Sequence, residues 1–411
     1  MKYDVIVIGA GAAGMMAAYA AARNGASTLV LERNEKPGRK IAITGKGRCN
    51  VTNDCDRDGF FAAVKHNPKF LYSAYSMFNA QDAMEFFQKQ GVKLKVERGA
   101  RVFPESDKAF DIVDALKNAM KFAGAKVKYG VRVKELMLND GVVTGVIDEE
   151  GNSYEANSVI VTCGGVSYPT TGSTGDGYTL AKQAGHSVVE PRASLCGFDT
   201  DDSWTGKWAG ITLKNVTLTA KCGKKTLYQE IGEMLFTHMG VSGPLFLTLS
   251  AIIDRQELCD VTCTVDLKSG LDREALAASI DRRIAENPKK LARSLVEGLL
   301  PHAMAGEILE LCDIPENLTV SNLSRPMRQA LVDLLKAFPV HLCAYAPIRE
   351  AIVTRGGVKV KEIAPATMAS KLVQGLYFAG EVIDVDAKTG GFNLQIAFCT
   401  GYAAGVAAVQ R

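Results

Sequence analysis

The segment Gly-Ala-Gly-Ala-Ala-Gly at residues 9–14 constrains this chain most, because of what lies on either side of it. Residues 3–8 are rich in Val and Ile without alternation, which predicts a strand buried on both faces. An alanine-rich segment follows, predicted to be a helix that ends near Gly25, and then a second apolar strand at 27–31 that leads to Glu32. This order of elements is typical of a βαβ unit that binds a dinucleotide.

Each glycine of the turn has its own physical role. Gly9 permits a tight turn, Gly11 lets a pyrophosphate approach the backbone, and Gly14 lets the helix pack closely on the strand. The helix N-terminus, with Ala13 in its first turn, then faces the diphosphate. We expect Glu32 to accept hydrogen bonds from ribose hydroxyls, and its charge disfavours a 2′-phosphate. The fingerprint therefore predicts FAD or NAD rather than NADP.

The C-terminal region favours FAD. An NAD site is largely complete after its βαβ unit, whereas a flavin needs further residues from elsewhere in the chain. Here a predicted buried strand at 376–379 is followed by a polar segment and a glycine turn at 390–391 that leads into a helix beginning near Leu394. A helix N-terminus stabilises the negative charge of a reduced flavin. The predicted FAD contacts in this region are Gly380, Glu381, Asp384, Asn393 and Leu394.

The stretch TGKGRCNVTN at residues 44–53 is interpreted as a flavin cradle. A phosphate-binding P-loop does not fit, because its first glycine falls on Lys40 and Gly47 occupies the Ser/Thr position. Gly45 and Gly47 let the backbone pass close to the ring, and Cys49 is expected to serve packing. The other predicted contacts are Arg39, Lys40 and Arg48 at the diphosphate, Asn50 at the ring edge, Val133 at the adenine, and Arg33 and Gly164.

Three blocks of sequence resemble one bacterial flavoprotein family. KIAITGKGRCNVTN, GGVSYPTTGSTGDGY and LYFAGEVIDVDAKTGGFNLQIAFCTG are similar to the BaiN-like family, which includes aminoacetone oxidases and 3-dehydro-bile-acid reductases. The lengths between the blocks also fit, so the resemblance covers essentially the whole chain. It implies an FAD-dependent oxidoreductase.

A more remote resemblance concerns the way FAD is held. The VTCGG and TGDG segments at 161–165 and 174–177 are similar to segments of fumarate reductases and ketosteroid dehydrogenases, which often bind flavin covalently through a histidine. None of the five histidines lies in the cradle, His66 being the nearest in sequence, so we expect noncovalent FAD. The turn at 386–389 departs from the commoner Asp-Gly-aromatic form. The resemblance therefore does not identify the residues that face the substrate.

Composition excludes several classes of protein. The chain has 411 residues, 47% of them hydrophobic, and a formal net charge of only +3 without a basic tract, so nothing predicts a nucleic-acid or membrane partner. The ten cysteines form no CxxC pair, which favours reduced thiols in a cytoplasmic protein over a disulfide framework or a metal site. Beyond the N-terminal apolar run, no segment is expected to reach the roughly 18 uncharged apolar residues that a membrane span needs. A small-molecule substrate is the expected partner, and the oligomeric state is left open.

The predicted fold is α/β, with a discontinuous Rossmann-type FAD-binding domain at 1–190 and 346–411. An inserted substrate domain at 191–345 is expected to combine a β-rich part at 191–268 with a small helical lobe at 269–338. We expect a loop at 240–244 and an active site where the insert meets the flavin. The lobe's helices are expected to break at Pro288, Pro301, Pro315 and Pro326.

The sequence leaves the catalytic residue unknown. A proton donor or oxyanion stabiliser near the ring should be a Tyr, Lys, Arg or His. Arg48, Tyr168, His238 and Lys388 are candidates by position, and none stands out. Arg355 is compatible with a substrate carbonyl or with a neighbouring acid.

Three functions remain open from the sequence. The favoured one is NAD(P)H-linked reduction of a C=C bond conjugated with a carbonyl, as in oxo-bile acids. An amino-ketone oxidase that yields peroxide is the first alternative, and an RNA-associated or non-catalytic flavoprotein is the second. Because only one dinucleotide fingerprint exists, NAD(P)H is expected to react through a transient site.

Overall fold

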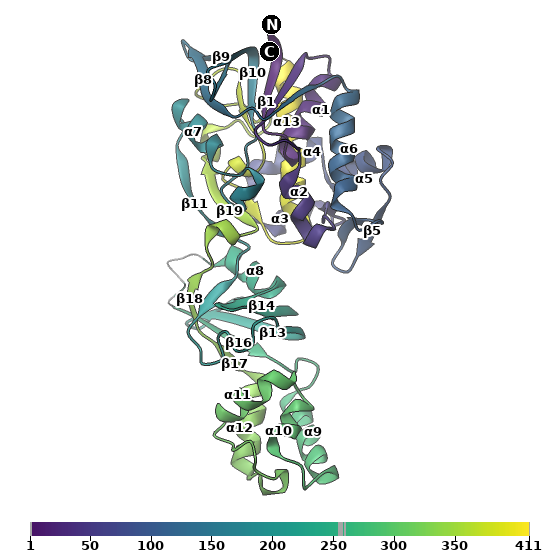
Figure 1. Cartoon of the computed structure of the whole chain (residues 1–411), viewed down its shortest axis with the longest axis vertical. Helices are drawn as coiled ribbons and strands as arrows, with labels where there is room; N and C mark the ends of the chain where they lie inside the picture. Colours follow the sequence, from purple (N-terminus) through teal and green to yellow (C-terminus); the bar gives the residue numbers. More distant parts are fainter. Residues whose placement is uncertain (1, 254–257, 259, 411) are drawn as a thin grey trace. The chain divides into compact units, whose positions relative to one another are not determined.

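The computed structural model describes residues 2–253, 258 and 260–410, and the chain forms two compact units (Figure 1). Unit 1 consists of Met1–Ser194 and Ile348–Arg411, and unit 2 of Leu195–Pro347. Unit 1 is therefore built from two separate stretches of the chain, and both of its termini lie at the same end of it (Figure 1).

Unit 1 contains a seven-stranded sheet in the order β7-β2-β1-β10-β9-β8, with β20 beside β10. The strands β7, β2, β1, β10 and β20 run parallel to one another. The strand β9 pairs antiparallel with both of its neighbours, β10 and β8. The parallel pair β1 and β2 is joined by α1, which confirms the predicted Rossmann-type α/β fold. The strands are β1 (Tyr3–Ile8), β2 (Thr28–Glu32), β7 (Lys126–Tyr129), β8 (Val133–Asn139), β9 (Val142–Asp148), β10 (Ser153–Val161) and β20 (Leu376–Phe378).

Helices and three small sheets complete unit 1. The small sheets pair β3 (Thr52–Asn53), β6 (Arg101–Pro104) and β5 (Leu94–Glu97), then β4 (Val64–His66) with β21 (Asp386–Ala387), and β11 (Val188–Ser194) with β19 (Val353–Val358). The helices are α1 (Ala12–Arg23), α2 (Arg39–Ile43), α3 (Arg57–Ala63), α4 (Tyr72–Met77), α5 (Ala80–Lys89), α6 (Ala109–Phe122), α7 (Asp176–Gln183) and α13 (Phe392–Val409).

The helices α1 and α13 pack with their backbones unusually close. A Cβ atom added to Gly401 would lie 2.4 Å from the carbonyl oxygen of Ala13, and one added to Gly405 would lie 2.3 Å from that of Ala17. Only glycine at these two positions of α13 permits this approach, because any side chain would clash with the backbone of α1. Because α13 has 18 residues and is apolar enough to cross a membrane by length and composition, the sequence expectation of no such segment is wrong. Since 67% of it is buried inside the protein, α13 has the character of a core helix.

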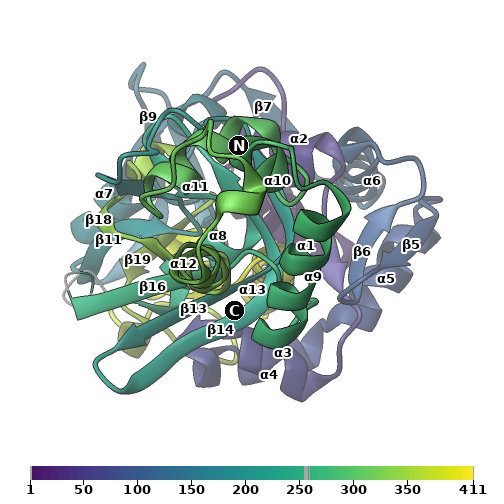
Figure 2. The same ribbon diagram turned by 90° about the horizontal axis from the view of Figure 1, so that it is seen from below.

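Unit 2 contains a second seven-stranded sheet, ordered β17-β16-β13-β14-β15-β12-β18, and Figure 2 shows β13, β14 and β16 side by side. Its strands are β12 (Phe198–Thr200), β13 (Thr212–Cys222), β14 (Lys225–Phe236), β15 (Gly240–Ser242), β16 (Val261–Asp266), β17 (Phe338–Val340) and β18 (Leu342–Tyr345). Its helices are α8 (Pro244–Ile252), α9 (Arg273–Glu286), α10 (Ala292–Glu297), α11 (Ala305–Glu310) and α12 (Arg325–Lys336).

Two local expectations for unit 2 are wrong. Residues 240–244 do not form a loop, because Gly240–Ser242 pairs with both β12 and β14 and Pro244 begins α8. Pro326 does not break a helix but occupies the first turn of α12, where its missing N–H has no helical partner to lose. A three-residue strand and a proline in the first turn of a helix produce little periodic signal. The sequence therefore predicted neither feature.

The contact between α1 and α13 gives a stability prediction. Gly401→Ala should destabilise unit 1 by about 1–3 kcal/mol, because the new methyl group forces the two helices apart. Thermal unfolding of the purified protein measures the effect. Gly270→Ala is the control, since its added Cβ meets nothing within 4 Å. Equal melting temperatures for both variants would contradict this packing argument.

Candidate functional site

The glycine turn is held by backbone contacts and leaves open space at one position. Gly9 has a φ of 98°, and a Cβ on Gly14 would lie 1.9 Å from the Gly9 carbonyl oxygen. The Thr162 hydroxyl, just beyond β10, donates to the carbonyls of Ile8 at 2.8 Å and Gly9 at 3.0 Å. In contrast, a Cβ on Gly11 would meet nothing within 4 Å. The turn is therefore rigid and tightly packed underneath, and open at Gly11.

Glu32 ends β2 as a buried carboxylate with 5% exposure. Its Oε2 accepts from the Ala10 N–H at 2.6 Å, and its Oε1 accepts from the backbone N–H and side-chain amide of Asn34 at 2.8 and 2.7 Å. These three bonds leave one of about four carboxylate lone-pair positions free for a hydroxyl. The carboxylate is thus fixed against the glycine turn and retains the capacity to bind a ribose.

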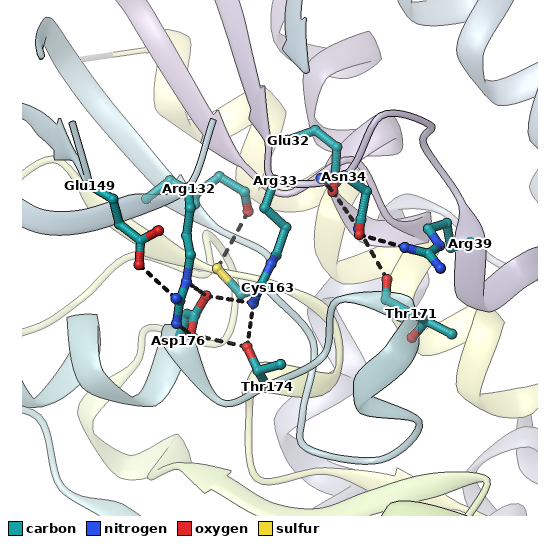
Figure 3. A network of polar contacts seen from close by, with 11 residues as sticks. Glu32, Arg33, Asn34, Arg39, Arg132, Glu149, Cys163, Thr171, Thr174 and Asp176 are labelled. Carbon is teal, nitrogen blue, oxygen red and sulfur yellow. Dashed lines mark hydrogen bonds and ion pairs between the residues drawn. The ribbon is translucent and has the colours of Figure 1, made fainter. Parts of the chain in front are cut away.

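A network of charged side chains surrounds Asp176 at the start of α7 (Figure 3). Arg132 donates to both of its carboxylate oxygens, at 2.8 and 2.9 Å, and Arg33 contacts it at 3.0 Å. Burial alone would raise the pKa of Asp176, but the bonds and charge of Arg132, with help from Thr174 and Arg33, lower it below its usual value. The sequence placed Arg33 at the cofactor, whereas the structure engages its guanidinium in this network.

Lys40 and Glu381 form an ion pair although 341 positions separate them in the sequence. The pair lies next to the loop at 164–167. Lys40 Nζ donates to both Glu381 oxygens, at 2.7 and 3.0 Å, and to the Ser167 hydroxyl at 2.7 Å. Glu381 Oε1 also accepts from the Thr354 N–H at 2.7 Å. Lys40 and Glu381, both predicted to contact the cofactor, therefore lie together and are paired with each other.

The predicted flavin cradle has a defined local structure. Residues Arg39–Ile43 form the short helix α2, and Gly45 and Lys46 both have positive φ, at 57° and 58°. A Cβ on Gly47 would meet nothing within 4 Å, so open space adjoins the backbone there. Burial raises the pKa of the Cys49 thiol to about 12, which agrees with a packing role rather than a redox one.

The polar residues of this segment are bound within the protein. Arg48 pairs with Glu97 and Asp107, and its guanidinium lies 4.3 Å from the centre of the Phe103 ring. The Asn50 side chain, oriented so that both ends are satisfied, accepts from the Gly391 N–H at 3.1 Å and donates to two carbonyls. Arg39 is exposed and donates to the Asn34 side chain at 2.9 Å. The proposed contacts of these three residues with FAD stay predictions.

The C-terminal segment is tied to β4 and α13. Asn393 donates to the Ala387 carbonyl at 2.8 Å and accepts from the Ala387 N–H at 2.9 Å, so the start of α13 holds β21 in place. Burial raises the pKa of Asp384, and the Asn67 amide that donates to it opposes the rise. Leu394 packs against the hydrophobic core of unit 1 and is partly buried.

The remaining candidates differ in their surroundings. Tyr168 has a φ of 49°, which is unusual for a bulky side chain and marks local strain. Lys388 Nζ lies 5.9 Å over the Phe392 ring. Val133 is buried at the start of β8, and Gly164 has a φ of 74°. His238 is exposed and belongs to unit 2, and Arg355 lies on β19 of unit 1.

Sequence reasoning missed several polar side chains around the site. Asn34 and Ser167 bind the predicted cofactor residues Glu32 and Lys40, and the partly exposed His66 pairs with the buried Asp386. The Tyr178 hydroxyl is buried without a hydrogen-bond partner in the described part of the chain. No local sequence pattern marks these residues, because most of their contacts are with residues far away in sequence.

The geometry of the turn fits a dinucleotide cofactor. Open space at Gly11 permits a pyrophosphate, the N-terminus of α1 offers unpaired N–H groups, and Glu32 has an acceptor position left for a ribose hydroxyl. The chain matches the HI0933-like protein Rossmann domain over residues 3–407. The chain belongs to this family.

Relatives and fold neighbours agree with that assignment. A 3-dehydro-bile acid delta(4,6)-reductase of Clostridium scindens is 31% identical over 98% of this chain and 98% of its own. A ribosomal RNA dihydrouridine synthase of Haemophilus influenzae is 34% identical over 97% of this chain and 96% of its own. The 3-ketosteroid-delta4-(5alpha)-dehydrogenase from Rhodococcus jostii RHA1 shares the fold, with a TM-score of 0.50, 16% identity and coverage of 100% and 97% of the two chains. This HI0933-like protein is an FAD-dependent oxidoreductase.

Gly11 offers a test of the cofactor site that spares the fold. Gly11→Ala should weaken FAD binding at least tenfold, a loss of about 1.4 kcal/mol, because its methyl group enters space that the protein leaves open. Its melting temperature without FAD should stay unchanged. Gly270→Ala is the control, because Gly270 lies outside the turn, has no positive φ, and its added Cβ meets nothing within 4 Å. Titration of the apoprotein with FAD measures the affinity, and an unchanged affinity would contradict the assignment.

The Asp176 network predicts a pH-dependent stability. Asp176→Asn should cost about 1.5–3 kcal/mol at neutral pH, because Arg132 and Arg33 lose a charged acceptor. Since the folded-state pKa of Asp176 is lowered, its stabilisation is complete above the unfolded value and is lost as pH falls through the folded pKa. The difference in melting temperature from wild type should therefore shrink below about pH 4. Glu149→Gln, at an exposed partner of Arg132, should have little effect at either pH.

Proposed function

We propose that this protein reduces a carbon–carbon double bond conjugated with a carbonyl, using FAD and a nicotinamide dinucleotide as reductant. The main support is the 31% identity, over 98% of both chains, with a 3-dehydro-bile acid delta(4,6)-reductase. The name of this relative supports a steroid-like enone as the substrate class of this protein. FAD, when bound and reduced, supplies the hydride.

The chain's own residues hold the cofactor and handle charge. Gly11 and the N-terminus of α1 bind the diphosphate, and Glu32 binds the ribose of the adenosine. The N-terminus of α13 offers free N–H groups beside the glycine turn at 390–391, which suits a site that stabilises negative charge. A conjugated carbonyl develops negative charge when hydride adds to its β-carbon. We therefore expect the proton donor to lie near the N-terminus of α13.

Uridine in ribosomal RNA is a second candidate substrate. Two relatives are named ribosomal RNA dihydrouridine synthase, from Haemophilus influenzae at 34% identity and Escherichia coli at 31%. The C5=C6 bond of uracil is conjugated with its C4 carbonyl, so its reduction belongs to the same reaction class. Arg57 lies 5.4 Å over the exposed Tyr72 ring, a pairing that suits base stacking. The low net charge favours the small enone.

Reoxidation of the reduced enzyme discriminates among these substrates. The FAD-loaded enzyme is photoreduced without oxygen and mixed with a 3-oxo-Δ4 steroid, with unmodified ribosomal RNA, or with oxygen. We expect the steroid to reoxidise the flavin fastest and to gain two hydrogen atoms, as measured by absorbance and mass spectrometry. Faster reoxidation by RNA would identify the uridine substrate instead.

The reductive half-reaction tests the role of nicotinamide. NADH or NADPH should bleach the flavin and leave before the substrate enters, which gives ping-pong kinetics because the chain has only one dinucleotide fingerprint. An enzyme that neither nucleotide reduces, but that an amino ketone reduces with release of peroxide in air, would be an oxidase and would refute the proposal.

A further inference from the structure

A buried hydrogen-bonded chain joins three segments of unit 1 that are distant in sequence. Asp386 on β21 has no exposed surface, and its Oδ2 accepts from the Ser194 hydroxyl at 2.6 Å. Its Oδ1 contacts Nδ1 of His66 on β4. The two strands also pair directly, with Asp386 opposite His66. The aspartate is thus held from both sides, and the histidine is the only member of the trio with an exposed edge, 26% of its side chain.

The contact fixes how the imidazole presents its second nitrogen. An ionised carboxylate can only accept, so Nδ1 of His66 carries a proton and donates it to Asp386. Within the described part of the chain, no hydrogen-bond partner is found for Nε2 of His66. A histidine oriented in this way by an aspartate is the arrangement by which proteins aim a proton at a reacting group.

The trio adjoins the segment at 384–393 that contains residues predicted from the sequence to contact FAD, Asp384 and Asn393. Asp386 directly precedes Ala387, which the Asn393 side chain clamps to the start of α13. Asn67, next to His66, donates to the Asp384 carbonyl at 2.7 Å and to its carboxylate at 3.1 Å. His66 therefore lies against the 384–393 segment although 320 positions separate it from Asp386.

Stability alone is a poor explanation for such a group. Burying a carboxylate costs several kcal/mol, and pairing it with one partner commonly gives no net gain over an apolar replacement. The other His–Asp pair described in the chain, His341 with Asp202, has its histidine 68% exposed and so lacks the restraint of His66.

We propose that His66 is the proton donor of the reduction and that Asp386, anchored by Ser194, is its positioning residue. This inference rests on the proposed function. FAD, when bound and reduced, would supply the hydride that the β-carbon of the conjugated C=C bond takes up. The N–H bond at Nε2 of the His66 imidazolium breaks, and its proton joins the α-carbon, where the electron pair of the enolate forms the new C–H bond. The imidazole is left neutral and regains a proton from solvent.

Half-reactions separate proton delivery from the other steps. His66→Gln should slow reoxidation of the reduced flavin by the 3-oxo-Δ4 steroid roughly 100-fold or more, with FAD affinity and the rate of flavin reduction by NAD(P)H unchanged. Asp386→Asn, which keeps the shape of the side chain, should slow the same step to a smaller extent. His341→Gln is the matched control and should behave as wild type. Unchanged reoxidation by His66→Gln, or an equal loss in His238→Gln, would overturn the proposal.

A spectroscopic readout tests the dyad apart from any substrate. In ¹⁵N-histidine-labelled enzyme, with the His66 signals assigned by their loss in His66→Gln, the neutral ring should be protonated at Nδ1. Asp386→Asn should change that tautomer balance, whereas the signals of His341 should not move. A neutral His66 protonated at Nε2 in the wild type would overturn the dyad. A wild type with the expected tautomer that reduces neither steroid nor RNA would instead refute the proposed function.

Discussion

Unit 1 depends on one constraint, the close approach of backbones around the glycine turn between β1 and α1. Gly14 lies against the carbonyl of Gly9, Gly401 of α13 lies against the carbonyl of Ala13, and Thr162 beyond β10 bonds the turn itself. Because the two glycine contacts leave no room for a side chain and the Thr162 hydroxyl ties β10 to the turn, the turn, α1, β10 and α13 are packed as one body. The N-terminus of α1 is positioned by that body, and every proposed contact with the cofactor takes its place from it.

Charge is arranged around this body in separate pairs. Glu32 is fixed by Ala10 and Asn34, Asp176 by Arg132 and Arg33, and Glu381 by Lys40. Each carboxylate is buried or half-buried, so its partner compensates the loss of water. Pairing also limits what these groups do, since a lysine or arginine already bound to an acid is a weaker candidate for a diphosphate. The unpaired N–H groups of the helix N-termini are better suited to that task.

The reaction class unites relatives with different substrates. A conjugated steroid ketone and a uracil ring both accept hydride at a carbon β to a carbonyl, and both then need a proton. Reduction of either substrate would therefore need one hydride source and one acid. In this chain the acid that we propose, His66 held by Asp386, would act on either substrate, because protonation of the α-carbon is common to both reactions.

The amino-acid pattern was enough to predict the Rossmann βαβ unit, because strand, turn, helix and Glu32 lie within one short segment whose signals are local. It also indicated that Cys49 is a packing residue. It did not reveal α2, the strand at Gly240–Ser242 or the partners of Arg33 and Arg48, because these depend on contacts between distant segments. Only the tertiary structure brought His66, Ser194 and Asp386 together, since hydrogen bonds across hundreds of positions leave no periodic signal in the chain.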